Sequence, residues 1–437
     1  MRDDYGQRPS RRRVLAGGVA GAAVVGAGAL AWPAGDHGGG HDAYFTGLSA
    51  ALTKAGVAQP VLVVDTTRLD ANIKAVSDTL GKAGSQAGGQ PKGLRIVVKS
   101  LPCHDLMDRV AAGLKTKRYM VFNQPMLVEM GARLPDADML MGKPLPVAAA
   151  AAYYDTLGAQ APGPQWLIDT PERLAQYTAM AKVRGVALSV NFEIDVGLHR
   201  GGLTDPRDLA ALLATLDPAV TACGLMGYDP HVAKMPGIFD MRGKALARAK
   251  DLYARMAAVL REKAPLKEGQ APYTFNTAGS PTYALHTDDP VATEVAVGSA
   301  FVKPTDFDID TLAHHQPACF IATPVLKVEE PALIPGLEGL AGVAAFFDPN
   351  TARAFFVQGG HWLANPVSPP GLQLSGLYGR SSNQERWSGS RRVPLKPDDW
   401  VFLRPSQSEA VLLQFGPLLA YDGAAITGRW PVFEMSA

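Results

Sequence analysis

Short runs rich in β-branched residues alternate with helix-like segments over much of the chain, and this alternation constrains the fold most. Apolar strands that are bounded by turns and separated by helices are typical of a parallel sheet covered on both faces. The pattern therefore predicts an α/β fold. The runs are Val61–Asp65, Leu94–Lys99, Arg118–Phe122, Asp138–Gly142, Gln165–Asp169, Ala187–Glu193, Val220–Gly227, Tyr273–Thr277 and Glu294–Gly298.

Setting aside the first run as a lead-in strand leaves eight strands, the number that closes a (β/α)8 barrel. The competing arrangement is an open, doubly wound sheet. A Gly-x-Gly-x-x-Gly motif after the first strand would support that alternative, and this sequence has none there. We predict a barrel over residues 59–312, preceded by a linker and a short N-terminal helix over residues 32–58.

The character of the sequence changes beyond about residue 315, where Pro, Gly and aromatic residues rise and helical periodicity fades. This composition favours short strands joined by turns. We predict that residues 313–437 form a C-terminal, mostly-β domain. Its expected strands are Ala318–Val328, Gly342–Phe347, Arg353–Val357, Trp400–Arg404 and Ala410–Phe415.

Residues 1–31 have the pattern of a twin-arginine export signal. Arg11 and Arg12 precede the uncharged stretch Val14–Ala31, which ends in the small-x-small sequence Ala29-Leu30-Ala31. The stretch is dominated by Gly and Ala, which favours a cleaved signal over a membrane anchor. We expect export by the twin-arginine machinery and a periplasmic mature protein; an uncleaved signal would tether the protein to the membrane.

The charge balance argues against a nucleic-acid partner. The chain has 42 Lys plus Arg against 41 Asp plus Glu, and without residues 1–31 it has 37 basic and 39 acidic residues. A protein that binds nucleic-acid phosphates carries a marked excess of Lys and Arg over Asp and Glu. The balance points instead to a protein that handles a small molecule.

Lys99 ends the first predicted barrel strand, and the carboxyl ends of barrel strands carry function. A lysine that closes a buried run can simply extend its amine to solvent at the rim. It can also be a desolvated amine that forms a Schiff base with a carbonyl compound. The strand by itself leaves both interpretations open.

The fifth and sixth strands are followed by further polar residues. Charged residues between glycines in the stretch 193–202 suit a ligand-facing loop. After the sixth strand, Tyr228 and His231 could form an acid/base pair, although a structural histidine is an equally good interpretation.

Small and hydroxyl residues follow the seventh and eighth strands, and in a barrel these two loops commonly bind phosphate. These loops read Thr277-Ala278-Gly279-Ser280-Pro281-Thr282 and Gly298-Ser299-Ala300. Each loop by itself could be a plain turn. A phosphate cradle opposite a Schiff-base lysine requires a phosphorylated aldehyde, so we predict pyridoxal 5'-phosphate (PLP) as the cofactor.

The order of these motifs resembles the alanine-racemase-like (fold type III) PLP enzymes, and most of all their D-threonine aldolase and D-serine dehydratase branch. The likeness runs from about residue 58 to the C-terminus. Its motifs are Pro60-Val-Leu-Val-Val-Asp65, Asn72, Val-Val-Lys99-Ser100, Asp195-x-Gly-x-x-Arg200-x-Gly, Gly227-Tyr228-x-x-His231, Gly279-Ser-Pro-Thr282 and Gly298-Ser299.

The resemblance implies a role for each site residue. Lys99 would carry the internal aldimine, Arg200 would approach the cofactor ring oxygen, and Tyr228 would line the reacting face. The phosphate would lie near Gly279, Ser280, Thr282 and Ser299. The resemblance also implies a homodimer in which each site is built from a barrel and the partner's β domain.

Two stretches depart from the family pattern. The family aldolases and dehydratases have Lys-Thr-His-Lys where this chain has Lys99-Ser100-Leu101-Pro102. They also have a His-x-Cys or His-x-Asp metal pair, which corresponds here to Gln407 and Glu409. Because Gln is a poor ligand for a borderline metal, these two are weak candidates and we expect no established metal site. His231 or His361 could substitute, but their spacing does not establish it.

We expect an enzyme that acts on D-amino acids, a lyase of β-hydroxy-D-amino acids of the D-threonine aldolase or D-serine dehydratase type. An amino-acid racemase is the runner-up. A PLP-binding protein without turnover is the alternative from another class, and the substantial β domain argues against it. A sugar-acting barrel would need carboxylates on opposite sides of the mouth, whereas Glu193 and Asp195 share one strand end.

Overall fold

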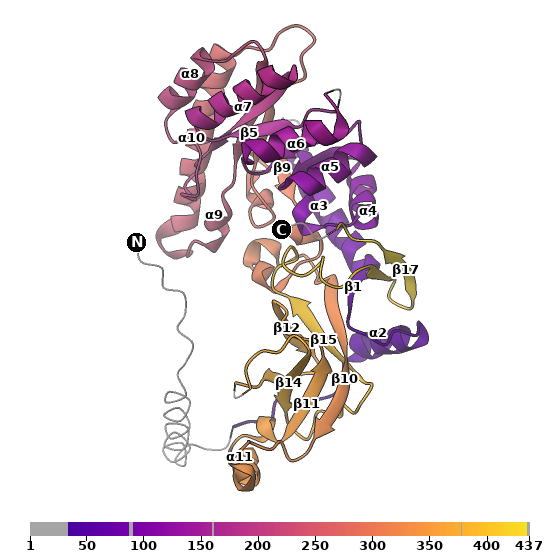
Figure 1. Ribbon diagram of the computed structural model, residues 1–437. Coiled ribbons are helices and arrows are strands. Elements are labelled where there is room, and N and C mark those ends of the chain that lie inside the picture. The colour runs from indigo at the N-terminus through magenta and orange to yellow at the C-terminus, as the bar shows by residue number, and fades with distance from the viewer. Residues whose placement is uncertain (1–33, 87–90, 160, 377, 435–437) are drawn as a thin grey trace. The chain divides into compact units, whose positions relative to one another are not determined.

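The computed structural model describes residues 34–86, 91–159, 161–376 and 378–434, which form two compact units (Figure 1). Among the described residues, the larger unit comprises those of Ala43–Thr323, His361–Val367 and Phe402–Ala437. The smaller unit comprises residues 34–42 with those of Pro324–Gly360 and Ser368–Val401.

A closed barrel of eight parallel strands forms the centre of the larger unit, with β9 returning to pair with β2. This confirms the predicted (β/α)8 barrel followed by a mostly-β region. The barrel strands are β2 (Gly93–Val97), β3 (Arg118–Val121), β4 (Asp138–Met141), β5 (Gln165–Ile168), β6 (Leu188–Ile194), β7 (Val220–Gly227), β8 (Thr274–Thr277) and β9 (Glu294–Val297).

Helices follow the strands and cover the outside of the barrel (Figure 1). Three of these turns are specified locally, because Asn123, Thr170 and Asp205 each accept a hydrogen bond from a backbone N–H of the helix they precede. The helices are α3 (Thr66–Gln86), α4 (His104–Leu114), α5 (Gln124–Arg133), α6 (Val147–Leu157), α7 (Pro171–Arg184), α8 (Pro206–Ala214), α9 (Pro230–Lys234) and α10 (Met241–Lys263).

One strand end differs from the sequence prediction. The run Leu94–Lys99 was expected to be strand throughout, but β2 ends at Val97 and Lys99 lies in the 3-10 helix η2 (Val98–Ser100). The backbone N–H of Leu101 donates to the carbonyl of Val98 and closes this turn. Lys99 is therefore presented from a tight turn at the carboxyl end of β2.

A second group of strands in the larger unit lies outside the barrel. The lead-in strand β1 (Val61–Asp65) pairs antiparallel with β10 (Cys319–Glu329) and parallel with β16 (Leu418–Tyr421). β16 pairs in turn with β17 (Ile426–Trp430). The predicted N-terminal helix is present as α2 (Ala43–Lys54), whose Phe45 packs against Phe320 and Phe402. β15 (Trp400–Pro405) pairs with β10 and with β12 (Ala364–Ser368).

The smaller unit is built on an antiparallel sheet. β14 (Gln384–Gly389) pairs with β11 (Arg353–Gln358) and with β13 (Gln373–Leu374), and β11 pairs with the end of β10. The predicted strands at 318–328, 353–357 and 400–404 are confirmed as β10, β11 and β15.

Two predicted strands of the C-terminal region are wrong. Gly342–Phe347 falls within a helix, α11 (Ala341–Phe347), since its alanines favour helix more strongly than its apolar residues favour strand. Residues 410–415 form a turn, because the backbone N–H groups of Val411 and Leu412 both donate to the carbonyl of Ser408.

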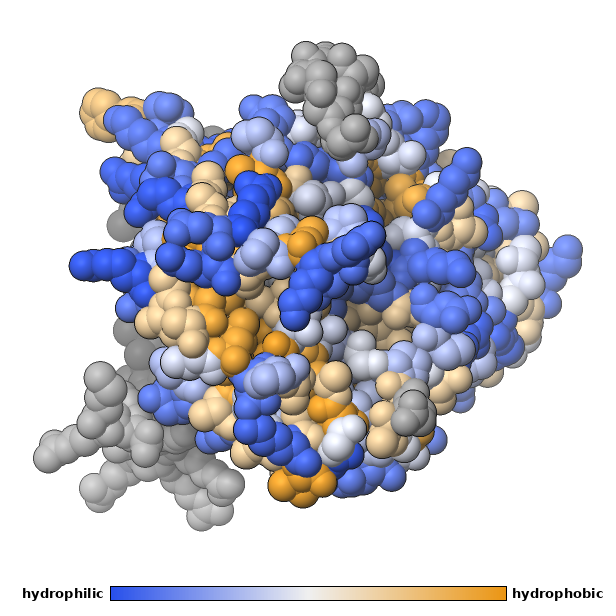
Figure 2. Space-filling view, turned by 90° about the horizontal axis from the view of Figure 1, so that it is seen from above, coloured by the Kyte–Doolittle hydropathy of each residue, from blue (hydrophilic) through white to orange (hydrophobic). Residues whose placement is uncertain are grey.

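The predicted signal at 1–31 lies outside the described residues. Within the described parts of the chain, no helix is long and apolar enough to cross a membrane. On the face shown in Figure 2, hydrophilic residues cover much of the surface and apolar residues show between them in small groups. Such a surface is what amphipathic helices present once their apolar faces are packed on a core.

Candidate active site

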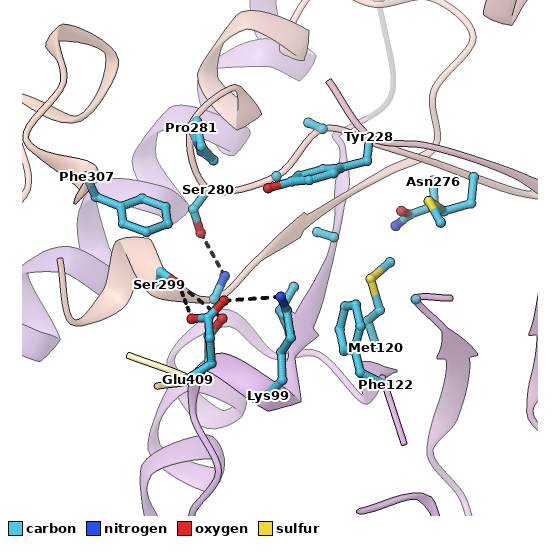
Figure 3. Close-up of a pocket in the computed structure, with 18 of the residues that line it drawn as sticks. Lys99, Met120, Phe122, Tyr228, Asn276, Ser280, Pro281, Ser299, Phe307 and Glu409 are labelled. Carbon is cyan, nitrogen blue, oxygen red and sulfur yellow. Dashed lines mark hydrogen bonds and ion pairs between the residues drawn. The ribbon is translucent and has the colours of Figure 1, made fainter. Parts of the chain in front are cut away.

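A cavity of about 580 Å³ opens at the carboxyl ends of the barrel strands (Figure 3). The carboxyl ends of barrel strands commonly hold active sites. Its polar lining residues are Lys99, Ser100, Arg200, Tyr228, Asn276, Ser280, Ser299 and Glu409. Its apolar lining includes Val97, Met120, Phe122, Met226, Ala296 and Phe307.

Lys99 brings an amine into this cavity. Its Nζ lies 3.1 Å from Oε1 of Glu409 and 4.8 Å from the centre of the Phe122 ring. The side chain is 39% exposed, so the amine is accessible from the cavity and held by one carboxylate and one aromatic face.

Glu409 reaches the cavity from a loop that follows β15. At the end of that strand, Arg404 is buried and bonds both carboxylate oxygens of Asp308, at 2.8 and 2.7 Å. Burial opposes ionisation of Glu409, but the charge of Lys99, with hydrogen bonds from Lys99 and Ser408, holds the pKa of this carboxyl below its ordinary value. Glu409 is therefore an ionised carboxylate beside the amine.

Buried hydroxyl groups meet on the other side of Glu409. Ser299 lies 3.1 Å from the hydroxyl of Ser100 and 3.2 Å from that of Ser408. Ser280, from the neighbouring loop, accepts hydrogen bonds from the backbone N–H groups of Gly298 and Ala300. The loops after β8 and β9 are thus joined at one edge of the cavity and carry the hydroxyls there.

Tyr228 lines the cavity from the end of β7. Burial raises the pKa of its phenol to about 12, although the guanidinium of Arg200, 5.0 Å from the ring centre, acts in the opposite direction. Gly279 lies against the same ring, and a Cβ at this position would collide with it. The phenol of Tyr228 therefore stays protonated near neutral pH, and the absence of a side chain at Gly279 leaves space for its ring.

Thr282 is fully buried and does not line the cavity. Its hydroxyl donates to Oδ1 of Asp229 at 2.6 Å and accepts from the backbone N–H of Gly279. Oδ2 of Asp229 lies 2.7 Å from Nε2 of His286, whose Nδ1 lies 3.3 Å from Asp289. Burial disfavours the charged imidazole, but these two carboxylates outweigh it and raise the pKa of His286 to about 9. Thr282 acts as part of a charged, buried network under the Tyr228 loop.

Three other predicted residues lie away from the cavity lining. His231 is in α9, beside Gly197, where an added Cβ would come within 3.1 Å of its Nε2. Gln407 is exposed and donates to Asp306 at 2.9 Å. His361 is exposed in the loop before β12. Across residues 34–434, as far as they are described, no group of three or more His, Cys, Asp or Glu side chains is arranged to hold a metal ion.

Sequence reasoning missed several lining residues. Phe122 and Asn276 come at strand ends, as Lys99 does, so position in the barrel could have identified them. No sequence pattern indicates Phe307 or the ion pair between Arg404 and Asp308. Glu409 was considered only as a weak metal ligand, and its contact with Lys99 joins residues 310 positions apart.

The sequence matches the family described as alanine racemase, N-terminal domain, over residues 64–305. The match spans more than half of the chain, and the chain belongs to this family of PLP enzymes, which includes lyases and racemases. No curated protein matches the sequence.

Solved structures share the fold at low sequence identity. The D-threonine aldolase of Filomicrobium marinum is 17% identical, with a TM-score of 0.65 over 86% of this chain and 97% of that one. The D-threo-3-hydroxyaspartate dehydratase of Delftia sp. HT23 is 14% identical, with a TM-score of 0.65 over 86% and 98%. The alanine racemase of Bartonella henselae with covalently bound pyridoxal phosphate is 14% identical, with a TM-score of 0.55 over 80% and 92%.

The residues around the cavity fit PLP. Lys99 offers an accessible amine to an aldehyde, and Phe122 and Met120 offer apolar surface to an aromatic ring. At Gly298 a Cβ would come within 2.8 Å of the side chains of Val97 and Ser100, so glycine lets the loop after β9 pack closely against the turn that carries Lys99. The buried hydroxyl of Ser299 is a suitable donor to a phosphate oxygen.

Proposed function

We propose that this protein is a PLP-dependent lyase of β-hydroxy-D-amino acids, of the D-threonine aldolase or D-serine dehydratase type. One observation carries the proposal: the amine of Lys99 enters the same cavity as the hydroxyls of Ser280 and Ser299. An amine and a phosphate-binding edge in one cavity match the aldehyde and the phosphate group of PLP. The aldolase and the dehydratase among the similar folds support the lyase class.

Each residue in the cavity would have a defined task. Lys99 would bind the aldehyde carbon, and Ser299, with the loop at Gly279, would hold the phosphate. When bound, PLP supplies an electron-withdrawing ring that stabilises negative charge at the Cα of an attached amino acid. Tyr228, with its pKa raised to about 12 by burial, donates a hydrogen bond or a proton near neutral pH. Arg200, whose guanidinium lies 5.0 Å from the centre of the Tyr228 ring, would offer its positive charge to the cofactor ring or to the substrate carboxylate.

Racemisation is the second candidate, and the placement of Tyr228 favours it. Inverting Cα requires that a proton leave on one face and return on the other. Lys99 follows β2 and Tyr228 follows β7, so the amine and the phenol reach the cavity from different strands. Such a pair could serve the two faces of a bound amino acid.

We also propose that the protein is a homodimer and that it is exported to the periplasm. The dimer follows from the family, whose members are commonly oligomeric. Export rests on the paired arginines and the weakly apolar stretch within residues 1–31. Mass measurement on protein recovered from the periplasm would test both proposals, since a cleaved dimer has a defined mass.

A panel of D- and L-amino acids, including the β-hydroxy ones, tests the function. The purified protein is loaded with PLP and each reaction is read for aldehyde, ammonia and the opposite enantiomer, with and without a divalent metal. Aldehyde or ammonia from a β-hydroxy-D-amino acid supports the lyase. The opposite enantiomer alone supports the racemase. Bound PLP with no product from any amino acid would favour a binding protein and contradict both enzymes.

A further inference from the structure

One carboxylate is aimed at the reactive amine of the cavity. Among the described residues that line it, Glu409 is the single acidic side chain. Its Oε1 lies 3.1 Å from Nζ of Lys99. Its Oε2 lies 3.1 Å from the hydroxyl of Ser408 and 3.4 Å from that of Ser299. Dashed lines in Figure 3 mark the contacts of Glu409 with Lys99 and Ser299. The two oxygens thus have separate partners, and Oε1 is the one directed at the amine.

The backbone that carries Glu409 is fixed on both sides. Upstream, Arg404 bonds Asp308 and the carbonyls of Lys303 and Pro304. The carbonyl of Ser406 accepts from the backbone N–H of Asp306. Downstream, two N–H groups close a turn on Ser408. Because these bonds join the loop to the segment after β9, the carboxylate is positioned by the fold.

An ammonium has no lone pair with which to attack an aldehyde, so Lys99 must first lose a proton. Forming an imine also expels the aldehyde oxygen as water, and that step is assisted by an acid. A carboxylate within hydrogen-bond distance of Nζ can accept the first proton and return it in the second step. Lys99 from η2 faces Glu409 directly, and the negative charge of Glu409 acts across the cavity on the phenol of Tyr228, where it adds to the rise in the pKa of that phenol.

We propose that Glu409 is a catalytic residue that takes the proton from Lys99 and returns it during covalent capture of the cofactor aldehyde. This rests on the proposed function, in which Lys99 binds PLP. Oε1 removes one proton from Nζ, and the freed electron pair forms the bond from Nζ to the aldehyde carbon. The aldehyde oxygen leaves as water with two protons, one from Nζ and one returned by Glu409.

The test measures capture of PLP by cofactor-free protein, without any substrate. PLP is added at a series of pH values, and the visible absorbance of the lysine-bound form is followed in a stopped-flow instrument. In Glu409→Gln the plateau rate should fall about 100-fold, the usual loss when a positioned acid/base group is removed. Glu409→Asp should recover part of the rate.

Two controls separate this role from a structural one. Gln407→Ala changes the same loop at a side chain directed to Asp306, and its plateau rate should equal that of the unaltered protein. Formate added to Glu409→Ala should restore rate in proportion to its concentration, which a misfolded variant would not show. An unchanged plateau rate in Glu409→Gln would overturn the role of Glu409 and leave the proposed function standing. Failure of the unaltered protein to form the visible band would overturn the proposed function and this inference together.

Discussion

The two ends of the barrel both contain charged groups, but they use them differently. At the amino ends of the strands, Arg95 is fully buried and bonds Glu294 at 2.6 Å and Asp138 at 2.9 Å. It also donates to the backbone carbonyl of Asp138. At the carboxyl ends, Lys99 has a single carboxylate partner and remains 39% exposed. At the amino ends the charge of Arg95 is neutralised by two carboxylates, whereas at the carboxyl ends the amine of Lys99 stays accessible.

A charged group is therefore structural or reactive according to how fully it is paired with opposite charges, and its charge by itself does not decide this. A buried ion with all its donors satisfied can be removed only at a large cost in stability. An exposed ion with one partner contributes little to stability and is free to bind a ligand. The following experiments test this division.

Replacing the amine should have the largest effect on chemistry and almost none on folding. Lys99→Ala removes the group that binds PLP, so we expect loss of the visible absorbance and a fall in activity of at least about 1,000-fold. The free energy of unfolding should change by less than about 0.5 kcal/mol, since the pair with Glu409 is partly exposed. Lys74→Ala, at an exposed helix position, is the control. Absorbance and activity that survive in Lys99→Ala would contradict the assignment of Lys99.

Replacing Arg95 should have the opposite outcome. Arg95→Met leaves Glu294, which is 2% exposed, without its main partner, and should destabilise the protein by about 3–5 kcal/mol. Urea denaturation measures the loss, and PLP capture by the folded fraction should be unchanged. Adding Glu294→Gln should recover part of the stability, because the uncompensated charge is removed. Arg109→Met, which breaks an exposed pair with Asp70, should cost at most about 1 kcal/mol. Equal losses in the two arginine variants would refute the comparison.

The buried network around His286 lies near the cavity, and its charged groups are paired with one another. If pairing marks a structural group, His286 should contribute to stability. Hydrogen bonds to Asp229 and Asp289 outweigh the opposing burial and raise the pKa of His286 from 6.5 to about 9. Its stabilising contribution is therefore complete below pH 6.5 and is lost as the pH rises through 9, a loss of about 3 kcal/mol. For Asp289 burial is again outweighed, and the pKa falls from 3.8 to about 2, so its contribution is complete above pH 3.8 and disappears as the pH falls through 2. His286→Asn should flatten the decline of unfolding free energy between pH 6.5 and 9; an unaltered slope would show that His286 is not its source.

The smallest effect is expected at Gly279. In Gly279→Ala the new methyl group collides with the ring of Tyr228, which must shift, and we expect activity to fall about 10-fold, equivalent to about 1.4 kcal/mol. PLP capture by Lys99 should change less, because the amine is held elsewhere. Gly237→Ala, with nothing within 4 Å of the added Cβ, serves as the control. The role of Gly279 would be refuted if both alanine variants kept full activity.

Much of the barrel could be predicted because its strands are marked locally. Apolar β-branched runs and N-cap residues such as Thr170 and Asp205 depend on near neighbours in the sequence. The helix α11 was missed because its valine and aromatic residues suit a strand, whereas its alanines favour helix more strongly. The candidate site was predictable where residues follow barrel strands, as Lys99, Tyr228, Ser280 and Ser299 do. Residues that reach the cavity from other segments, such as Phe307, could not be predicted from the sequence.

The sequence by itself determined the alternation that closes the barrel and the strand ends where Lys99 and the hydroxyl loops lie. These follow from periodicity and turn chemistry, which act over a few residues. Only the tertiary structure decided that Glu409 meets Lys99, that Thr282 belongs to a buried network with His286, and that His231 lies away from the cavity lining. These contacts join segments far apart in the chain, and burial and charge pairing, which form only when the chain is folded, select them.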